Sequence, residues 1–144
     1  MSKASWYLGQ IRKWDLLVKN KMIERQQWKE IAMGVSANMG GERVQSSGSQ
    51  QKMADAINRY IDIEREIDEA IDKLVDARRE VLATIEQLNA TEYDVLHKLY
   101  VQGKDLQAVA DDLGKSYGWA ATMKGRALQS VQRILDKREK EQNV

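Results

Sequence analysis

The amino-acid sequence predicts an all-α protein with a long antiparallel, coiled-coil-like helical hairpin followed by a compact domain of short helices. Two observations predict this fold class. The 144 residues include no proline, the residue that breaks helices most strongly. Apolar residues recur at spacings of three and four along most of the chain, as they do on one face of a helix. The expected division is a hairpin at 1–89 and a second domain at 90–144.

The first expected helix covers about residues 4–33, where tryptophans and aliphatic residues form an apolar stripe. Gly34 is predicted to end it. The next stretch, "GVSANMGGERVQSSGSQ" at about 34–50, is rich in glycine, serine and asparagine. Such a composition is typical of a loop, so a Gly/Ser-rich connector is expected there.

The second expected helix carries a stricter pattern, in which steps of four and three alternate from about residue 50 to residue 88. This pattern is typical of the contact seam of a coiled coil. The seam runs along about 39 residues and faces a first helix of only about 30, so the remainder is expected to pack on the second domain or on a second subunit, and we expect a homodimer. The seam consists of Met53, Ile57, Tyr60, Ile67, Ile71, Leu74, Val81 and Ile85, and Glu64 and Arg78 interrupt it.

The composition offers little for catalysis. The chain has no cysteine and a single histidine, His97. The acids Glu64, Asp68, Asp72 and Asp76 recur on one helix face, which is more typical of a solvated surface than of a metal site. We therefore expect no enzyme activity, no metal and no cofactor. No apolar run is long enough to cross a bilayer, so the expected location is the cytoplasm, without a membrane partner.

The segment after residue 89 carries a succession of helix start and stop signals. Thr91 is predicted to cap one helix, and Gly103 to close it in the left-handed conformation. Asp105 is predicted to cap a short helix that Gly114 ends, and Ser116 to cap the next. Two helices joined by so tight a turn have the spacing of a helix-turn-helix, whose second helix reads DNA.

The helix after Ser116 lies in a window, 115–135, that contains four basic residues and no acid. If Ala120, Met123, Ala127 and Val131 face inward, small residues point outward and allow close approach to a DNA groove. Trp119 has two interpretations, a DNA contact or a core residue. The predicted DNA-binding residues are Lys115, Ser116, Tyr117, Gly118, Ala121, Thr122, Lys124, Gly125 and Arg126.

The stretch "TEYDVLHKLYVQGKDLQAVADDLGKSYGWAATMKGRAL" resembles region 4, the promoter-reading domain of bacterial sigma factors. The matching elements are Tyr100-Val101-Gln102-Gly103, Val109-Ala110-Asp111-Asp112-Leu113-Gly114, Ser116 and Arg126-Ala127-Leu128. The pattern departs at Lys124, where sigma factors carry a large aliphatic residue. The whole chain is similar to small phage and prophage transcriptional regulators of Gram-positive bacteria.

The resemblance implies a sigma region-4-like domain, a bacterial host cell and a regulator that binds double-stranded DNA. Two alternatives stay open. One is a small terminase subunit, which packages phage DNA and assembles as a ring. The other is a module that contacts RNA polymerase and has no stable DNA contact, an interpretation that the modest net charge of +1 permits.

Overall fold

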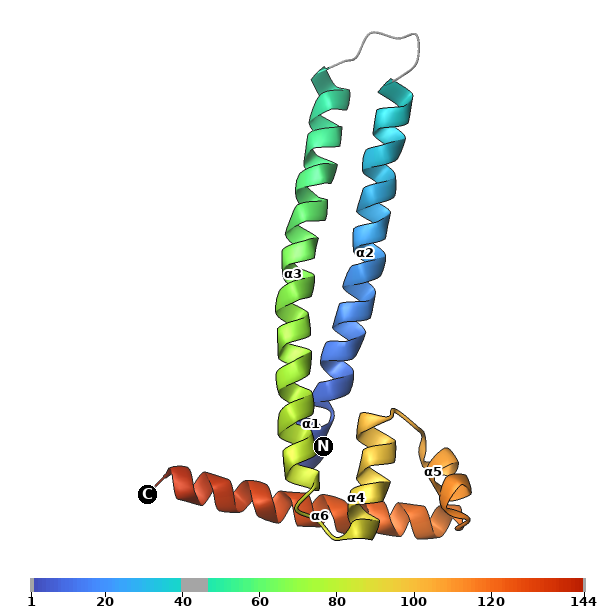
Figure 1. Ribbon diagram of the computed structural model, residues 1–144, viewed down its shortest axis with the longest axis vertical. Helices are drawn as coiled ribbons and strands as arrows, with labels where there is room; N and C mark the ends of the chain where they lie inside the picture. Colours follow the sequence, from blue (N-terminus) through green and yellow to red (C-terminus); the bar gives the residue numbers. More distant parts are fainter. Residues whose placement is uncertain (1, 40–46, 144) are drawn as a thin grey trace. The chain divides into compact units, whose positions relative to one another are not determined.

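The computed structural model describes residues 2–39 and 47–143, and every regular element in those ranges is a helix (Figure 1). The prediction of an all-α fold is therefore confirmed. The elements are α1 (Lys3–Leu8), α2 (Gln10–Met39), α3 (Ser47–Ile85), α4 (Ala90–Leu96), the π-helical segment η1 (His97–Val101), α5 (Leu106–Leu113) and α6 (Tyr117–Gln142).

The chain forms two compact units. Unit 1 contains Met1–Lys13 and Leu74–Val144, and unit 2 contains Trp14–Lys73. The N-terminal helix α1 thus belongs to the same unit as the predicted DNA-binding residues, although the sequence placed it in a separate hairpin. The expected division into domains 1–89 and 90–144 stays a prediction, because it concerns which segments fold independently.

The first predicted helix, about 4–33, begins where expected, but it is divided at Gly9 and ends later than predicted. Gly9 separates α1 from α2, and its N–H donates to the carbonyl oxygens of Ser5 and Tyr7. A Cβ at Gly9 would lie 3.1 Å from the Ser5 carbonyl oxygen, which explains why the smallest residue stands there. At the other end α2 runs past Gly34 to Met39. One glycine inside a helix costs only about 1 kcal/mol, less than is needed to stop a long helix.

The predicted connector at 34–50 is shortened by the same extension. Residues 34–39 belong to α2 and residues 47–50 belong to α3. The remaining part of this prediction, 40–46, lies outside the described residues.

The buried face of α3 is turned by one residue from the predicted seam. Tyr60, Ile67, Leu74 and Val81 are buried or half-buried as predicted, and Met53 and Ile85 are too. Ile57 and Ile71, in contrast, are 42% and 39% exposed. Ala56 and Ala70, one residue before each of them, are buried instead. The same shift by one residue holds along the helix, where the buried set includes Ala56, Ile63, Ala70, Ala77 and Thr84.

Charge explains this rotation of α3. The predicted seam would have carried Glu64 and Arg78 into a contact surface, and desolvating an unpaired charge is unfavourable. The observed face replaces them with Ile63 and Ala77, and both charged side chains are exposed. The two charged residues in the predicted seam therefore indicate that the buried face of α3 is the one shifted by one residue.

Within unit 2, α2 and α3 lie side by side and run in opposite directions (Figure 1). Lys21 Nζ lies 3.1 Å from Glu66 Oε2, and Arg59 Nη1 lies 3.6 Å from Glu66 Oε1. The hydrogen bond from Lys21 lowers the pKa of the Glu66 carboxyl below its ordinary value of 4.5. The acids expected on a solvated face are exposed: Glu64, Asp68, Asp72 and Asp76.

Unit 1 has a core of large aliphatic side chains. Leu8 of α1, Ile85 of α3, Leu96 of α4 and Val131 of α6 are fully buried. The start of α4 differs from the prediction, because Asn89 and not Thr91 caps it: Asn89 Oδ1 accepts from the Glu92 N–H at 2.9 Å. An amide oxygen three residues before an acid is a capping pattern that the sequence already contained.

Candidate nucleic-acid interface

The turn between α5 and α6 is built from the predicted cap residues. Asp105 Oδ1 accepts from the Ala108 N–H at 2.8 Å, and Ser116 Oγ accepts from the Trp119 N–H at 3.1 Å. Gly114 has φ +64°, in the left-handed region that favours glycine. The Lys115 N–H donates to the Ala110 carbonyl oxygen at 2.9 Å. These bonds hold the two helices at a sharp angle, which determines the direction in which α6 begins.

The inward face of α6 agrees with the prediction. Ala120, Ala127 and Val131 are fully buried, and Met123 is half-buried. Ala110 of α5 is also fully buried. Small residues on both helices allow their backbones to approach closely. The α6 helix is thereby fixed in rotation about its axis, and the opposite side of its first three turns must face outward.

Most of the predicted DNA-binding residues lie on that outward side or in the turn just before it, and we call the whole set the α6 face. Tyr117 is 54% exposed. Lys124 is half-buried and follows the buried Ala120 by one helical turn, so it lies at the edge of the set and not at its centre. The other members are exposed: Lys115, Ser116, Gly118, Ala121, Thr122, Gly125 and Arg126.

The basic side chains of Lys124 and Arg126 on the α6 face are not paired with acids among the described residues. Within residues 2–39 and 47–143, the side chains of Lys124 and Arg126 make neither a hydrogen bond nor an ion pair. Lys115 Nζ lies 5.6 Å from the ring centroid of Trp119. A cation over an aromatic face is attracted to it and still exposes part of its charge to water. Trp119 itself is half-buried, so both interpretations of its role remain open.

The acids of the preceding helix are all engaged by neighbours. Asp105 caps α5, Asp111 accepts from Gln107 Nε2 at 2.9 Å, and Asp112 pairs with Lys104. The hydrogen bond from Lys104 lowers the pKa of the Asp112 carboxyl below its ordinary value of 3.8. The ion pair with Lys104 offsets the charge of Asp112 and reduces its repulsion of a phosphate backbone, whereas Asp105 and Asp111 accept only from neutral donors and keep their charge.

A buried carboxylate that sequence analysis missed ties α4 to α6. Glu92 is 9% exposed, and the Ser130 hydroxyl lies 3.0 Å from each of its carboxylate oxygens. Arg133 Nη2 donates to the Ser130 Oγ at 2.9 Å. This chain of polar contacts fixes the middle of α6, and therefore the base from which the α6 face projects.

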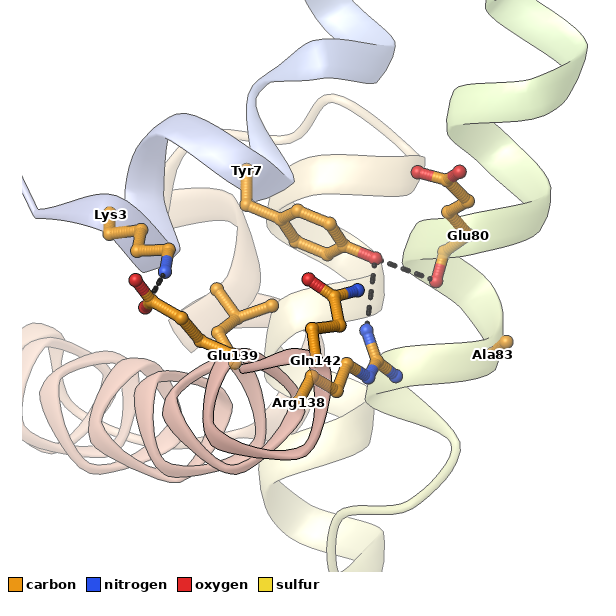
Figure 2. A pocket seen from close by; sticks show the side chains of 8 residues that line it. Lys3, Tyr7, Glu80, Ala83, Arg138, Glu139 and Gln142 are labelled. Atoms are coloured by element: carbon orange, nitrogen blue, oxygen red, sulfur yellow. Dashed lines mark hydrogen bonds and ion pairs between the residues drawn. The ribbon is translucent and has the colours of Figure 1, made fainter. Parts of the chain in front are cut away.

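A polar pocket lies farther along α6, between α1, α3 and α6 (Figure 2). The Tyr7 hydroxyl lies 2.9 Å from Thr84 Oγ1 and 3.2 Å from the Glu80 carbonyl oxygen, and it accepts from Arg138 Nη1 at 3.5 Å. Lys3 and Glu139 form an ion pair of 2.7 Å at its edge. Because these groups bond to one another across three helices, we assign the pocket a role in holding α1 against α6.

Neither a metal centre nor a membrane span occurs among the described residues. The described residues contain no group of three or more histidine, cysteine, aspartate or glutamate side chains placed to hold a metal ion. No helix among them combines the length and apolarity required to span a bilayer. Comparison with known proteins found no matching family model, no matching curated protein and no matching solved structure.

Proposed function

We propose that this protein is a non-enzymatic regulator of phage or prophage transcription that binds double-stranded DNA sequence-specifically in the cytoplasm of a bacterial host. In this proposal α5, the Gly114 turn and α6 form a sigma region-4-like helix-turn-helix, and α6 enters the major groove. The antiparallel pair α2 and α3 serves as a helical hairpin through which two copies form a homodimer.

One observation carries the proposal most strongly: the α6 face combines unpaired cations with small residues. Lys124 and Arg126 are free of internal partners among the described residues, and either can reach a phosphate or the guanine edge. Gly118, Ala121 and Gly125 are exposed between and beside them, so the helix backbone can approach a groove without a steric barrier.

The test compares two double variants that change the charge of α6 equally. Lys124→Ala/Arg126→Ala removes two cations from the α6 face, and Lys137→Ala/Lys140→Ala removes two exposed cations from the C-terminal part of the same helix. Binding to a fluorescent duplex from upstream of the neighbouring genes is measured by anisotropy. We expect the first variant to lose at least about tenfold in affinity, as two phosphate or base contacts imply.

The control variant should bind within a few-fold of the wild type, and both should unfold at the wild-type temperature. Equal binding by the wild type and Lys124→Ala/Arg126→Ala would remove the α6 face from the proposal. Equal losses in the two variants would show that affinity follows net charge and not this face.

A second variant tests the close approach of the backbone. Nothing lies within 4 Å of the position that a Cβ would take at Gly125, so Gly125→Ala fits the folded protein. The substitution should stabilise α6 by about 0.5–1 kcal/mol, since glycine is the weaker helix former. We expect it nevertheless to weaken DNA binding, because the methyl group separates the backbone from the groove. Unchanged DNA affinity would place Gly125 outside the contact.

A further inference from the structure

The outer side of α2 carries an apolar stripe that no described residue covers. Leu16, Ile23 and Ile31 are 45%, 57% and 47% exposed, on the side of α2 away from the buried Val18. Asn20 and Gln27 fill the exposed positions between them. The steps along this set are four, three, four and four, so its members form one continuous line on the helix. We call these five residues the α2 stripe.

We infer that the α2 stripe binds the α2 stripe of a second copy of this chain, with the two helices antiparallel. The sequence of the stripe is symmetric: Leu16 and Ile31 lie equally far along the helix on either side of the Ile23–Glu24 step, and so do Asn20 and Gln27. A two-fold axis at that step places Leu16 against Ile31 of the other copy and brings the two Ile23 side chains together. Self-complementarity of this kind is what a two-fold symmetric interface requires.

The polar members of the stripe favour the same pairing. The axis places Asn20 of one copy against Gln27 of the other, and each amide offers both donors and an acceptor. Among the described residues neither amide makes a side-chain hydrogen bond, so both are available. Polar residues paired inside a helical seam fix its register, because any shift would set them against aliphatic side chains.

Charge at the edge of the stripe is complementary too. Lys19 and Glu30 lie on the same flank of the stripe, and both are exposed. Within its own helix Lys19 Nζ lies 2.8 Å from Asp15 Oδ2, and Glu30 accepts from Gln26 Nε2 at 3.3 Å, so each would gain a second partner in the dimer. In the antiparallel arrangement Lys19 of one copy lies beside Glu30 of the other, and the two-fold axis repeats this pair. Opposite charges therefore meet at both ends of the contact.

The exposed apolar residues of α3 are less suited than those of α2 to a contact between two copies. Ile57, Ile61 and Ile71 form a second exposed stripe on α3. The exposed carboxylates Glu64 and Asp68 lie between them. Parallel or antiparallel pairing of two such stripes sets carboxylate against carboxylate, which is unfavourable. The amides within the α2 stripe carry no charge, and the carboxylate that meets its own copy near the axis, the exposed Glu24, lies on the flank of the stripe and not within it.

The inference rests on the homodimer of the proposed function but not on DNA binding. The stripe covers about two heptads, or about 22 Å of helix. An interface of this size belongs to the weak class, so we expect a dimer that dissociates in the micromolar range.

The chain has no cysteine, so single introduced cysteines report the pairing without background. Three full-length variants on α2 are compared under mild oxidation by non-reducing gel: Ile23→Cys, Leu16→Cys and Ile31→Cys. A disulfide needs Cα atoms within about 7 Å of each other. The expected dimer brings position 23 near its own copy, whereas the two copies of position 16 are about 22 Å apart.

We expect Ile23→Cys alone to form covalent dimers, and Leu16→Cys and Ile31→Cys to form them only when the two proteins are mixed. The exposed Ile61→Cys on α3 is the matched control and should stay monomeric on the gel. Cross-linking of Leu16→Cys and Ile31→Cys each with itself would overturn the antiparallel arrangement. Cross-linking of Ile61→Cys alone, or of no variant, would overturn the choice of surface.

An additional variant separates this inference from the proposed function. Ile23→Asp places two carboxylates at the two-fold axis and should shift the light-scattering mass from dimer to monomer. If the cysteine variants show the expected cross-linking pattern but the wild type binds no DNA, the α2 stripe stays intact and the DNA-binding proposal is removed. If the wild type binds DNA and Ile23→Asp has the same light-scattering mass as the wild type, the DNA-binding proposal stands and the α2 stripe is removed as the dimer contact.

Discussion

Unit 1 and unit 2 bury very different side chains. Among the residues whose burial the structure describes, Ile63 is the one large aliphatic side chain of unit 2 that is fully buried. The others lie in unit 1: Leu8, Val81, Ile85, Val95, Leu96, Val109 and Val131. The exposed large apolar residues show the opposite distribution, because most of them belong to unit 2, among them Leu16, Ile23, Ile31, Ile57, Ile61 and Ile71. Unit 1 has several helices to enclose a core, whereas two helices can bury only one side of each other.

This difference indicates that the two units are stabilised by different contacts. Large fully buried side chains stabilise unit 1 from within its own fold. Unit 2 leaves apolar area in water that only a further partner could bury, which is the condition that typically marks an interaction surface. Four substitution experiments test the contrast, in order of decreasing effect.

The largest effect is expected from removing a leucine side chain in each unit. Leu96→Ala leaves a cavity in the core of unit 1 and should cost about 2–5 kcal/mol of unfolding free energy. Leu16→Ala trims an exposed residue of unit 2 and should cost below about 0.5 kcal/mol in the monomer. Urea unfolding followed by circular dichroism, at a concentration low enough to avoid dimers, measures both. Similar losses would contradict the contrast between the units.

A second experiment concerns the buried polar groups, since both that occur among the described residues, Thr84 and Glu92, belong to unit 1. Ser130→Ala removes the hydroxyl that bonds Glu92 and leaves its carboxylate buried without that partner. The expected loss is about 1–3 kcal/mol. Glu92→Gln and the double variant complete a cycle in which the two losses should not add, because the residues share one contact. Additive losses would show that Ser130 does not stabilise the carboxylate.

A third experiment compares two glycines, one from each unit. Gly114→Ala forces an alanine into the left-handed conformation and should cost about 1–2 kcal/mol. Gly34→Ala should stabilise the protein by about 0.5–1 kcal/mol, because α2 continues through this position and a Cβ there meets open space. Thermal unfolding gives the sign of each change. A destabilising Gly34→Ala would indicate that α2 ends there after all.

The smallest effect is expected at the ion pairs of the surface. The pKa values of Asp112 and Glu66 are lowered by Lys104 and Lys21, so both pairs stabilise the fold above the ordinary carboxyl pKa values of 3.8 and 4.5. This contribution is lost as the pH falls through the lowered pKa values. Lys104→Met and Lys21→Met should each lower the unfolding temperature slightly at neutral pH and leave it unchanged in strong acid. A difference that persists in strong acid would have another origin.

Local signals predicted the α6 region well. Asp105, Gly114 and Ser116 act through contacts within three residues, and Ala120, Ala127 and Val131 share one helical face, so sequence spacing alone locates them. The buried face of α3 could not be predicted in the same way, because Ile57 and Ile71 on one face compete with Ile63 and Ile67 on the next. Only the cost of burying Glu64 and Arg78 separates the two. The contact between Glu92 and Ser130 spans two helices, and no local spacing predicts it.

The most direct test of the central claim is the light-scattering mass of the purified protein, alone and with a duplex from upstream of its neighbouring genes, at moderate salt. We expect twice the chain mass at high micromolar concentration and a further increase when the duplex is added. A ring-sized oligomer would contradict it and favour a terminase subunit. A monomer or dimer whose mass the duplex does not change would contradict the DNA-binding function and favour a module that contacts RNA polymerase.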